Sequence, residues 1–396
     1  MAQTVIEGVT VIPGGRRPVV RDAVVVLDDG QVVEITAGAA PGGDIYLVPA
    51  GVDLHLDNLV ERRRPRATVS LDHAAVLTVL DAECAAAGIA TVCVAARCED
   101  SPRKGIAIAD AAVLAATLED LAPFLCCDWR IHARVELTDD RALDALRAVL
   151  GVSSRVALIS MIETSVQRSR FSSLAETRAF YAKDWGVSEA EVEAVFTVDA
   201  GRLSMITDRR EEVAALARLH GIVLATHDDR TAEHIEQGFA VGARVAEFPL
   251  TMEAAVHAKA LGMTVVLGAP NAIRGRSTSS GNLLASDAVA AGVCDVLCSD
   301  YLPSSLQSAP RALAGRGVAP ISDAVDLVST NPSAVLGLSS GIIEVGSPLT
   351  ASLRRVQSVG TDTAIPGAQL GMALWRNGQL VFGRGSHAVG LPAVAK

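Results

Sequence analysis

The 396-residue sequence lacks the features of several protein classes. Acidic residues outnumber basic ones by 45 to 35, which argues against a general nucleic-acid binder because phosphate backbones need clustered Lys and Arg. The N-terminus has neither a basic region nor an uninterrupted apolar one, and the most apolar stretch, residues 74–96, contains Asp81 and Glu83. We therefore expect a cytoplasmic protein that binds neither nucleic acid nor a membrane.

Cysteine pairs at metal-binding spacing and a glycine-rich nucleotide turn are also missing. The seven cysteines are odd in number, and Cys126 and Cys127 are adjacent, so most are expected to be small buried side chains. No glycine-rich turn follows the first apolar strand of the central region, which argues against a dinucleotide-binding open sheet. Hydrophobic residues make up 50% of the chain, which predicts a large buried interior.

Both ends of the chain are predicted to form short strands. Asp29-Gly30 in residues 1–50 and Asn377-Gly378 in residues 339–396 each separate two segments with alternating apolar residues. Both dipeptides are typical of tight β-hairpin turns. We expect the two ends to combine into one small β-sandwich domain.

Between them, residues 51–338 alternate apolar strand-like segments with helical ones. The expected strands cover residues 52–57, 89–95, 130–137, 155–163, 221–229, 243–249, 263–271 and 294–301. Nearly continuous apolar strands that alternate with helices predict a parallel sheet buried on both faces. Eight of them in one domain predict a closed (β/α)8 barrel of the TIM type.

One connection, residues 164–220, is too long for a simple loop. It holds many of the chain's few aromatic residues: Phe171, Phe180, Tyr181, Trp185 and Phe196. This concentration favours a helical excursion that packs on something, and a lid over the barrel and a contact with a second subunit both stay open.

Nearly every expected strand ends in a polar or ionisable residue, where barrel enzymes build their active sites. In chain order these residues are His55, Asp57, Arg134, Glu136, Glu163, His227, Asp228, Asp229, Glu247, Asn271, Asp300 and Tyr301. So many carboxylates around one mouth would repel each other unless a cation or a proton compensated them. Imidazole and carboxylate ligands suit zinc, manganese or iron, and solvated acids at the surface are the alternative.

Other residues could join these strand ends. His132, Arg134 and Glu136 share one face of their strand, so they could act together if that face is the barrel interior. Residues 268–282 follow the seventh expected strand, and residues 167–170 follow the fourth; both segments are basic and could bind phosphate, with solvated loops as the alternative. Their candidate substrate-binding residues are Asn271, Arg274, Ser279, Asn282 and Arg168. At the strand ends, the further candidates for substrate binding are Arg134, Asp228, Asp229, Glu247 and Tyr301.

These motifs together resemble the amidohydrolase superfamily of metal hydrolases. More specifically, DLHLDN, HARVE, ATHDD, AEFPLTMEAA, GAPNAIRG, SGN and SDYLPSSL, in this order across residues 53–306, resemble the PhnM family of phosphonate metabolism. The resemblance implies hydrolysis of ribose 1-methylphosphonate 5-triphosphate with release of pyrophosphate. It implies His55, Asp57 and His227 as metal ligands, with Glu136 a further one, and Asp300 as the acid that takes a proton from water.

The chain departs from the PhnM pattern at two places. Glu163 and Thr164 stand where the family usually has an Asp-His pair, and Ser279 stands where it has a histidine. No lysine ends the fourth expected strand, so Glu163 would have to serve as a ligand if two metals are bound. We expect one or two divalent metals, zinc first.

Three hypotheses follow for the function. The first is a metal-dependent diphosphatase, the second is a hydrolase of C–N bonds in amides, cyclic amides or amidines, and the third is a non-catalytic relative that binds a phosphorylated ligand. In each case the expected partner is a small anionic molecule, and a homo-oligomer stays open.

Overall fold

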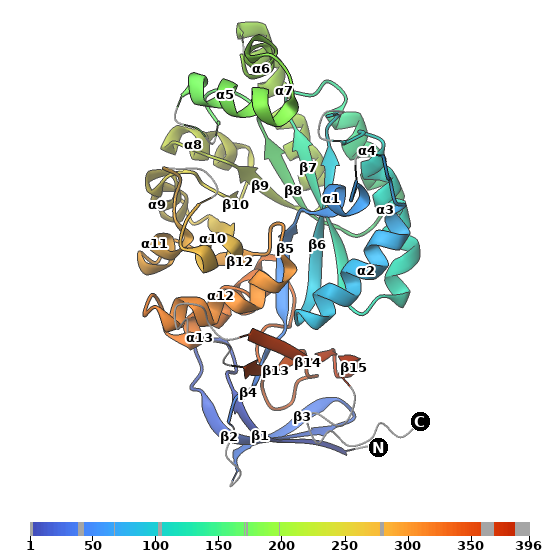
Figure 1. Ribbon diagram of the computed structural model, residues 1–396, viewed down its shortest axis with the longest axis vertical. Coiled ribbons are helices and arrows are strands. Elements are labelled where there is room, and N and C mark those ends of the chain that lie inside the picture. Colours follow the sequence, from blue (N-terminus) through green and yellow to red (C-terminus); the bar gives the residue numbers. More distant parts are fainter. Residues whose placement is uncertain are drawn as a thin grey trace.

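The computed structural model describes residues 3–38, 43–66, 68–101, 105–169, 171, 173–197, 199–277, 281–357 and 368–384 (Figure 1). Its two sheets form two bodies, a barrel surrounded by helices and a smaller sheet below it in the view of Figure 1. None of the described helices is long and apolar enough to cross a membrane.

The barrel consists of parallel strands that pair in chain order. They are β5 (Gly51–Leu56), β6 (Ile89–Cys98), β7 (Asp128–Glu136), β8 (Val156–Ile162), β9 (Val223–His227), β10 (Val245–Glu247), β11 (Thr264–Gly268) and β12 (Val296–Cys298). A parallel bridge between Leu56 and Asp300 closes the ring, since the Asp300 amide donates to His55 O at 2.9 Å. The predicted (β/α)8 barrel is confirmed.

Helices cover the outside of the barrel (Figure 1). They include α2 (His73–Ala86), α3 (Asp110–Leu121), α4 (Ala142–Val152), α7 (Ala200–His220), α8 (Ala232–Val241), α9 (Met252–Ala260), α10 (Ala269–Arg274), α11 (Ala285–Ala290) and α12 (Pro303–Gly315). Short side chains start several of them: the carboxylate of Asp72 accepts the Ala75 amide, and the Thr231 hydroxyl accepts the His234 amide. Three shorter helices are α1 (Leu59–Arg63), α13 (Ile321–Asp326) and α14 (Thr330–Val335).

Two apolar layers hold the barrel. Outside the sheet, Ile131, Ala133 and Val135 of β7 pack in the large core beneath the helices. Inside it, a separate cluster fills the ring: Val52, Leu54, Leu158, Ala225, Val245, Val266, Val296 and Cys298. The alternate residues His132 and Arg134 therefore face the interior, as the period of two predicts. The inner cluster forms an apolar floor under the polar residues at the carboxyl ends of the strands.

The smaller sheet takes strands from both ends of the chain, as predicted. Its order is β15-β14-β13-β4-β1-β2-β3, with bounds β1 (Gln3–Val11), β2 (Val20–Asp28), β3 (Gln31–Ala37), β4 (Ile45–Pro49), β13 (Ala351–Gln357), β14 (Ala368–Arg376) and β15 (Gln379–Gly383). Asp29 and Gly30 both have positive φ, 49° and 80°, in the tight turn between β2 and β3, and Asn377-Gly378 forms the matching turn between β14 and β15.

The long connection forms two extra helices, α5 (Leu174–Trp185) and α6 (Glu189–Phe196), before α7. Its aromatic rings pack on one another: the ring centroids of Tyr181 lie 4.7 Å from those of Trp185 and 5.0 Å from those of Phe196. Trp185 shares a cavity with Glu136 at the end of β7, so the extra helices cover one side of the barrel's carboxyl end.

Candidate active site

A pocket of about 270 Å³ opens at the carboxyl end of the barrel strands. Most of the strand-end residues singled out in the sequence line it, namely His55, Asp57, Arg134, His227, Asp228, Asn271, Asp300 and Tyr301, together with Asn282 of the segment 268–282. The polar lining stands on the apolar floor of the barrel, where charged groups interact more strongly than in water because the dielectric constant is low.

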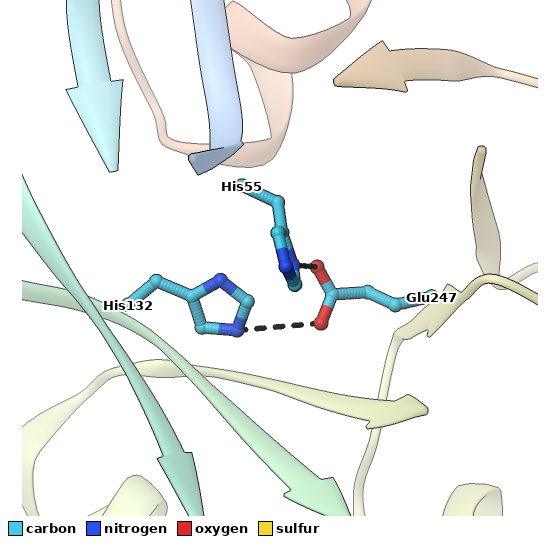
Figure 2. Close-up of side chains that lie close together, drawn as sticks. All are labelled: His55, His132 and Glu247. Atoms are coloured by element: carbon cyan, nitrogen blue, oxygen red, sulfur yellow. Dashed lines mark hydrogen bonds and ion pairs between the residues drawn. The ribbon is translucent and has the colours of Figure 1, made fainter. Parts of the chain in front are cut away.

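A buried cluster of metal-ligand type adjoins this pocket through His55, the member of the cluster that also lines the pocket. Figure 2 shows His55 of β5 and His132 of β7 directed at the two carboxylate oxygens of Glu247 from β10. His55 Nδ1 lies 3.2 Å from Oε1, and His132 Nε2 lies 3.3 Å from Oε2. Within the described part of the chain, this is the group whose ligand atoms all lie within 4.8 Å of one another.

The protonation states of this cluster suit a cation. Burial lowers the pKa of His55 to about 3, so the imidazole is neutral and can offer a lone pair at physiological pH. Burial alone would raise the pKa of Glu247, but the imidazoles of His132 and His55 hold its pKa well below the ordinary value. The Ser160 hydroxyl also donates to this carboxylate. His132 Nδ1 is buried with no hydrogen-bond partner among the described residues, so a donor atom stays available.

Asp57, by contrast, is bound by two arginines. Arg97 of β6 donates Nε to Oδ1 at 3.0 Å and Nη2 to Oδ2 at 2.7 Å, and Arg134 Nη1 also contacts Oδ2. His55 Nε2 lies 3.9 Å from the same oxygen. The carboxylate therefore already has two cationic partners, and one of them, Arg97, had no counterpart among the candidates from the sequence.

Strained backbone shapes the other side of the pocket. Asp228, Phe248 and Asp300 follow β9, β10 and β12, and all three have positive φ, 58°, 50° and 55°. Left-handed backbone is rare for residues other than glycine and is concentrated at functional sites. The amides of these residues continue the hydrogen-bond ladder of the barrel, so each chain turns sharply at the rim of the pocket.

Asp300 and His227 have altered environments in this rim. Burial raises the pKa of Asp300 to about 6, although the positive charge of Arg134 opposes the shift. His227 Nδ1 lies 3.1 Å from Asp228 Oδ2, while Nε2 lies 3.3 Å from Arg134 Nη2. A carboxyl group that titrates near neutrality is suited to accept a proton during hydrolysis.

Comparison with known proteins agrees with this architecture. No family model matches the chain. The chain is 31% identical over 356 residues to the alpha-D-ribose 1-methylphosphonate 5-triphosphate diphosphatase of Escherichia coli (strain K12), covering 87% of this chain and 90% of that protein. The chain belongs to the PhnM family. This confirms the resemblance inferred from the motifs and identifies the chain as a hydrolase of the amidohydrolase superfamily.

Solved structures share the fold of this PhnM-family chain at low sequence identity. The dihydropyrimidinase of Brevibacillus agri NCHU1002 superposes with a TM-score of 0.60 at 14% identity, covering 96% of this chain and 95% of that one. A D-hydantoinase gives 0.59 at 13% identity over the same fractions. The beta-aspartyl dipeptidase of Fervidobacterium islandicum AW-1 gives 0.56 at 12% identity, covering 96% of both chains.

Two candidate ligands of the PhnM-family chain lie away from the buried cluster. Glu136 accepts hydrogen bonds from the hydroxyls of Thr138 and Thr164, each at 2.6 Å, and lines a separate cavity beneath the extra helices. Glu163 is held by Arg168 Nε at 3.1 Å and by Arg210 Nη2 at 2.8 Å. Both carboxylates thus have their own partners outside the pocket.

Some of the candidate phosphate-binding residues line the pocket, and others lie outside it. Arg168 is buried against Asp229 and donates to Gln237 Oε1 at 3.0 Å, so it belongs to an internal network. Arg274 is exposed at the end of α10 and outside the pocket lining. Asn271 and Asn282 line the pocket, and Ser279 lies outside the described residues.

Asn271 also shapes this rim. Its side chain donates to Leu283 O at 3.1 Å and accepts the Ala285 amide at 3.0 Å. The contacts fix the segment that follows Asn282 against α10, which places Asn282 and Leu283 in the pocket wall. The side chain of Asn271 therefore stabilises the rim of the pocket.

Two members of the buried cluster were not proposed as ligands from the sequence. His132 was only grouped with Arg134 and Glu136, and Glu247 was a candidate for substrate binding. The period of two on β7 carried the signal for His132, because it places this residue on the interior face. No local pattern pairs Glu247 with either histidine, since the contact joins β5, β7 and β10 across the barrel.

Proposed function

We propose that the chain is a metal-dependent diphosphatase that cleaves a phosphoanhydride bond in a ribose triphosphate-type substrate. The observation that carries the proposal is the 31% identity with the E. coli diphosphatase along nearly the whole chain. The pocket supports it, because its lining combines guanidinium and amide donors for phosphate oxygens with a buried carboxyl group, Asp300.

The metal would be held by His55, His132 and Glu247. Two imidazoles and a carboxylate are a donor set for zinc, and manganese or iron accept the same ligands. Of the ligands implied by the resemblance, His227 and Asp57 face the same pocket and complete its polar wall. When bound, the cation supplies Lewis-acid chemistry and makes water nucleophilic near neutral pH.

The chain's own residues would perform the remaining steps. Asp300 accepts the proton of the attacking water at a carboxylate oxygen, since burial places its pKa near neutrality. Arg134 and Arg97 face the pocket from β7 and β6 and bind the anionic oxygens of the substrate. Asn271 and Asn282 stand on the opposite wall, and Tyr301 lies at the exposed rim.

A hydrolase of C–N bonds is the second candidate. The specific observation in its favour is that Thr164 and Ser279 replace the imidazoles expected in the PhnM family, while Glu163, beside Thr164, is bound by arginines outside the pocket. Loss of one transition-state donor typically costs about 2.7 to 4 kcal/mol, which could accompany a change of substrate. Family membership favours either enzyme over the non-catalytic alternative.

A substrate panel separates the two enzymes. The zinc-loaded protein is incubated with ribose 1-methylphosphonate 5-triphosphate, nucleoside triphosphates, N-acyl amino acids and cyclic amides. We expect pyrophosphate from the triphosphates and no turnover of amides. Turnover of amides alone would favour the second candidate and exclude the first.

Asp300→Asn tests the assignment within the same panel. Asparagine tolerates the positive φ of this position, so the fold should be retained, while kcat should fall by about 100-fold or more. Asp287→Asn on the exposed face of α11 is the matched control, with kcat expected to match the wild type. An unchanged kcat in Asp300→Asn would remove this residue from the mechanism.

A further inference from the structure

Arg134 occupies the space between two residues that the resemblance implies as metal ligands. Its Nη1 contacts Asp57 Oδ2, and its Nη2 lies 3.3 Å from His227 Nε2. A guanidinium has only donors and stays protonated in proteins. The Nε2 atom of His227 therefore faces a permanent cation, while its Nδ1 atom lies 3.1 Å from Asp228 Oδ2.

The carboxylate of Asp57 is bound by Arg134 and also by Arg97 of the adjacent strand. Arg97 binds both oxygens of the carboxylate, at 3.0 and 2.7 Å, in the paired geometry that guanidinium and carboxylate groups favour. The two arginines come from adjacent strands at paired positions, since Arg97 and Arg134 are partners in the β6–β7 register. This pairing places two permanent positive charges on one carboxylate.

The charge of the pocket also limits the number of cations. Among the residues that line the pocket or form the buried cluster, the carboxylates of Asp57, Asp228, Asp300 and Glu247 outnumber the guanidiniums of Arg97 and Arg134 by two. One dication at the buried cluster cancels this excess, whereas a second, on Asp57 and His227, would contact a guanidinium directly. Like charges in a low-dielectric site repel strongly.

We infer that Arg134 takes the place of a second metal ion, so that the chain binds one divalent cation, at His55, His132 and Glu247, and uses the guanidinium as its other fixed positive charge. This inference rests on the proposed function for the identity of the substrate. In that role Arg134, which lines the pocket, would bind an anionic oxygen of the substrate.

Zinc stoichiometry tests the inference without any turnover. Chelator-treated protein is dialysed against increasing Zn²⁺, and tightly bound zinc per chain is measured by plasma mass spectrometry. The wild type should saturate at one equivalent and Arg134→Met at two, because the substitution keeps the side-chain length and removes the charge. Arg134→Lys, which restores a cation, should return to one.

The control is Arg130→Met on the same strand, whose guanidinium pairs with Asp128 away from the pocket, with one equivalent expected. Circular dichroism monitors folding, and Arg134→Gln replaces Arg134→Met if the latter does not fold. The inference would be overturned if the wild type bound two equivalents of zinc per chain. It would also be overturned if folded Arg134→Met or Arg134→Gln bound only one. One equivalent without pyrophosphate release would instead refute the proposed function and leave the inference standing.

Discussion

At the scale of single residues, the buried cluster beside the pocket is held together by one carboxylate, that of Glu247. Glu247 binds His55 and His132 and accepts the Ser160 hydroxyl, although its side chain is fully buried. A buried carboxylate is costly unless each oxygen has donors or a cation. The contacts of Glu247 therefore fix both imidazole rings.

Glu247→Gln should weaken zinc binding by about 10- to 100-fold, because the charge and one acceptor are lost while the shape is kept. Competition with a chromophoric chelator measures this affinity. Glu236→Gln, at a carboxylate with 62% side-chain exposure that contacts His257, should bind zinc as the wild type does. Equal affinities in the two variants would show that Glu247 has no part in the metal centre.

The lowered pKa of His234 predicts how the free energy of unfolding changes with pH. Burial, with Arg168 nearby, lowers its pKa from 6.5 to about 4 in the folded chain. The stabilising contribution is fully present above pH 6.5 and is lost as the pH falls toward 4, because the unfolded state binds the proton first.

In His234→Gln, the free energy of unfolding should fall less between pH 7 and pH 4, by about 1 to 2 kcal/mol after allowance for the half-exposed ring. Urea denaturation at the two pH values measures the difference. His220→Gln at the exposed end of α7 is the control and should follow the wild type. Parallel losses in all three proteins would contradict the shifted pKa.

At the scale of elements, the internal network of Arg168 ties the long connection to the barrel. Arg168 joins the segment before α5 to Asp229 after β9 and to Glu163 after β8. Each partner is nearly buried, so removal of the arginine would leave unpaired charges in the interior. These residues therefore hold the carboxyl ends of β8 and β9 in place rather than binding substrate.

Arg168→Met should lower the free energy of unfolding by about 3 to 5 kcal/mol, because Asp229 would stay buried without its cation. Chemical denaturation measures this loss. Arg147→Met removes an exposed pair with Glu212 on α4 and α7 and should cost less than about 1 kcal/mol. A small loss for Arg168→Met would indicate that the network is solvated.

The strands were largely predictable from the sequence because β5 to β12 are apolar and separated by helices. The predicted strand at 130–137, for example, became β7 at 128–136. The partners of strand-end residues were not predictable, because they lie on different strands. Asp57 meets Arg97 and Arg134, and Glu163 meets Arg210 from α7, through contacts that no spacing along the chain encodes.

At the scale of the whole molecule, the barrel and the smaller sheet meet through close backbone contacts. Gly88, with φ of 77°, follows α2, and a Cβ there would approach Ser352 Oγ of β13 to 2.3 Å. Beside it, the buried guanidinium of Arg354 binds Ala87 O and Ser352 Oγ. The two bodies therefore fit together without room for an added methyl group.

Gly88→Ala should lower the melting temperature more than Gly262→Ala. Both glycines have φ of 77°, so alanine costs the same left-handed strain at each, but a Cβ at Gly262 meets nothing within 4 Å. The difference, on the order of 1 to 3 kcal/mol, reports the contact between the two bodies. If calorimetry gave equal losses of melting temperature for the two variants, the interface between the barrel and the smaller sheet would have to relax around the added methyl group.

The central claim is that the pocket at the barrel mouth hydrolyses a phosphoanhydride with the help of a divalent cation. Phosphorus NMR of ribose 1-methylphosphonate 5-triphosphate with the protein measures this directly. Pyrophosphate should form with zinc-loaded protein, stop after chelation and return when Zn²⁺ is added back. Hydrolysis that persists in the chelated protein, or no pyrophosphate from the zinc-loaded protein, would contradict the account.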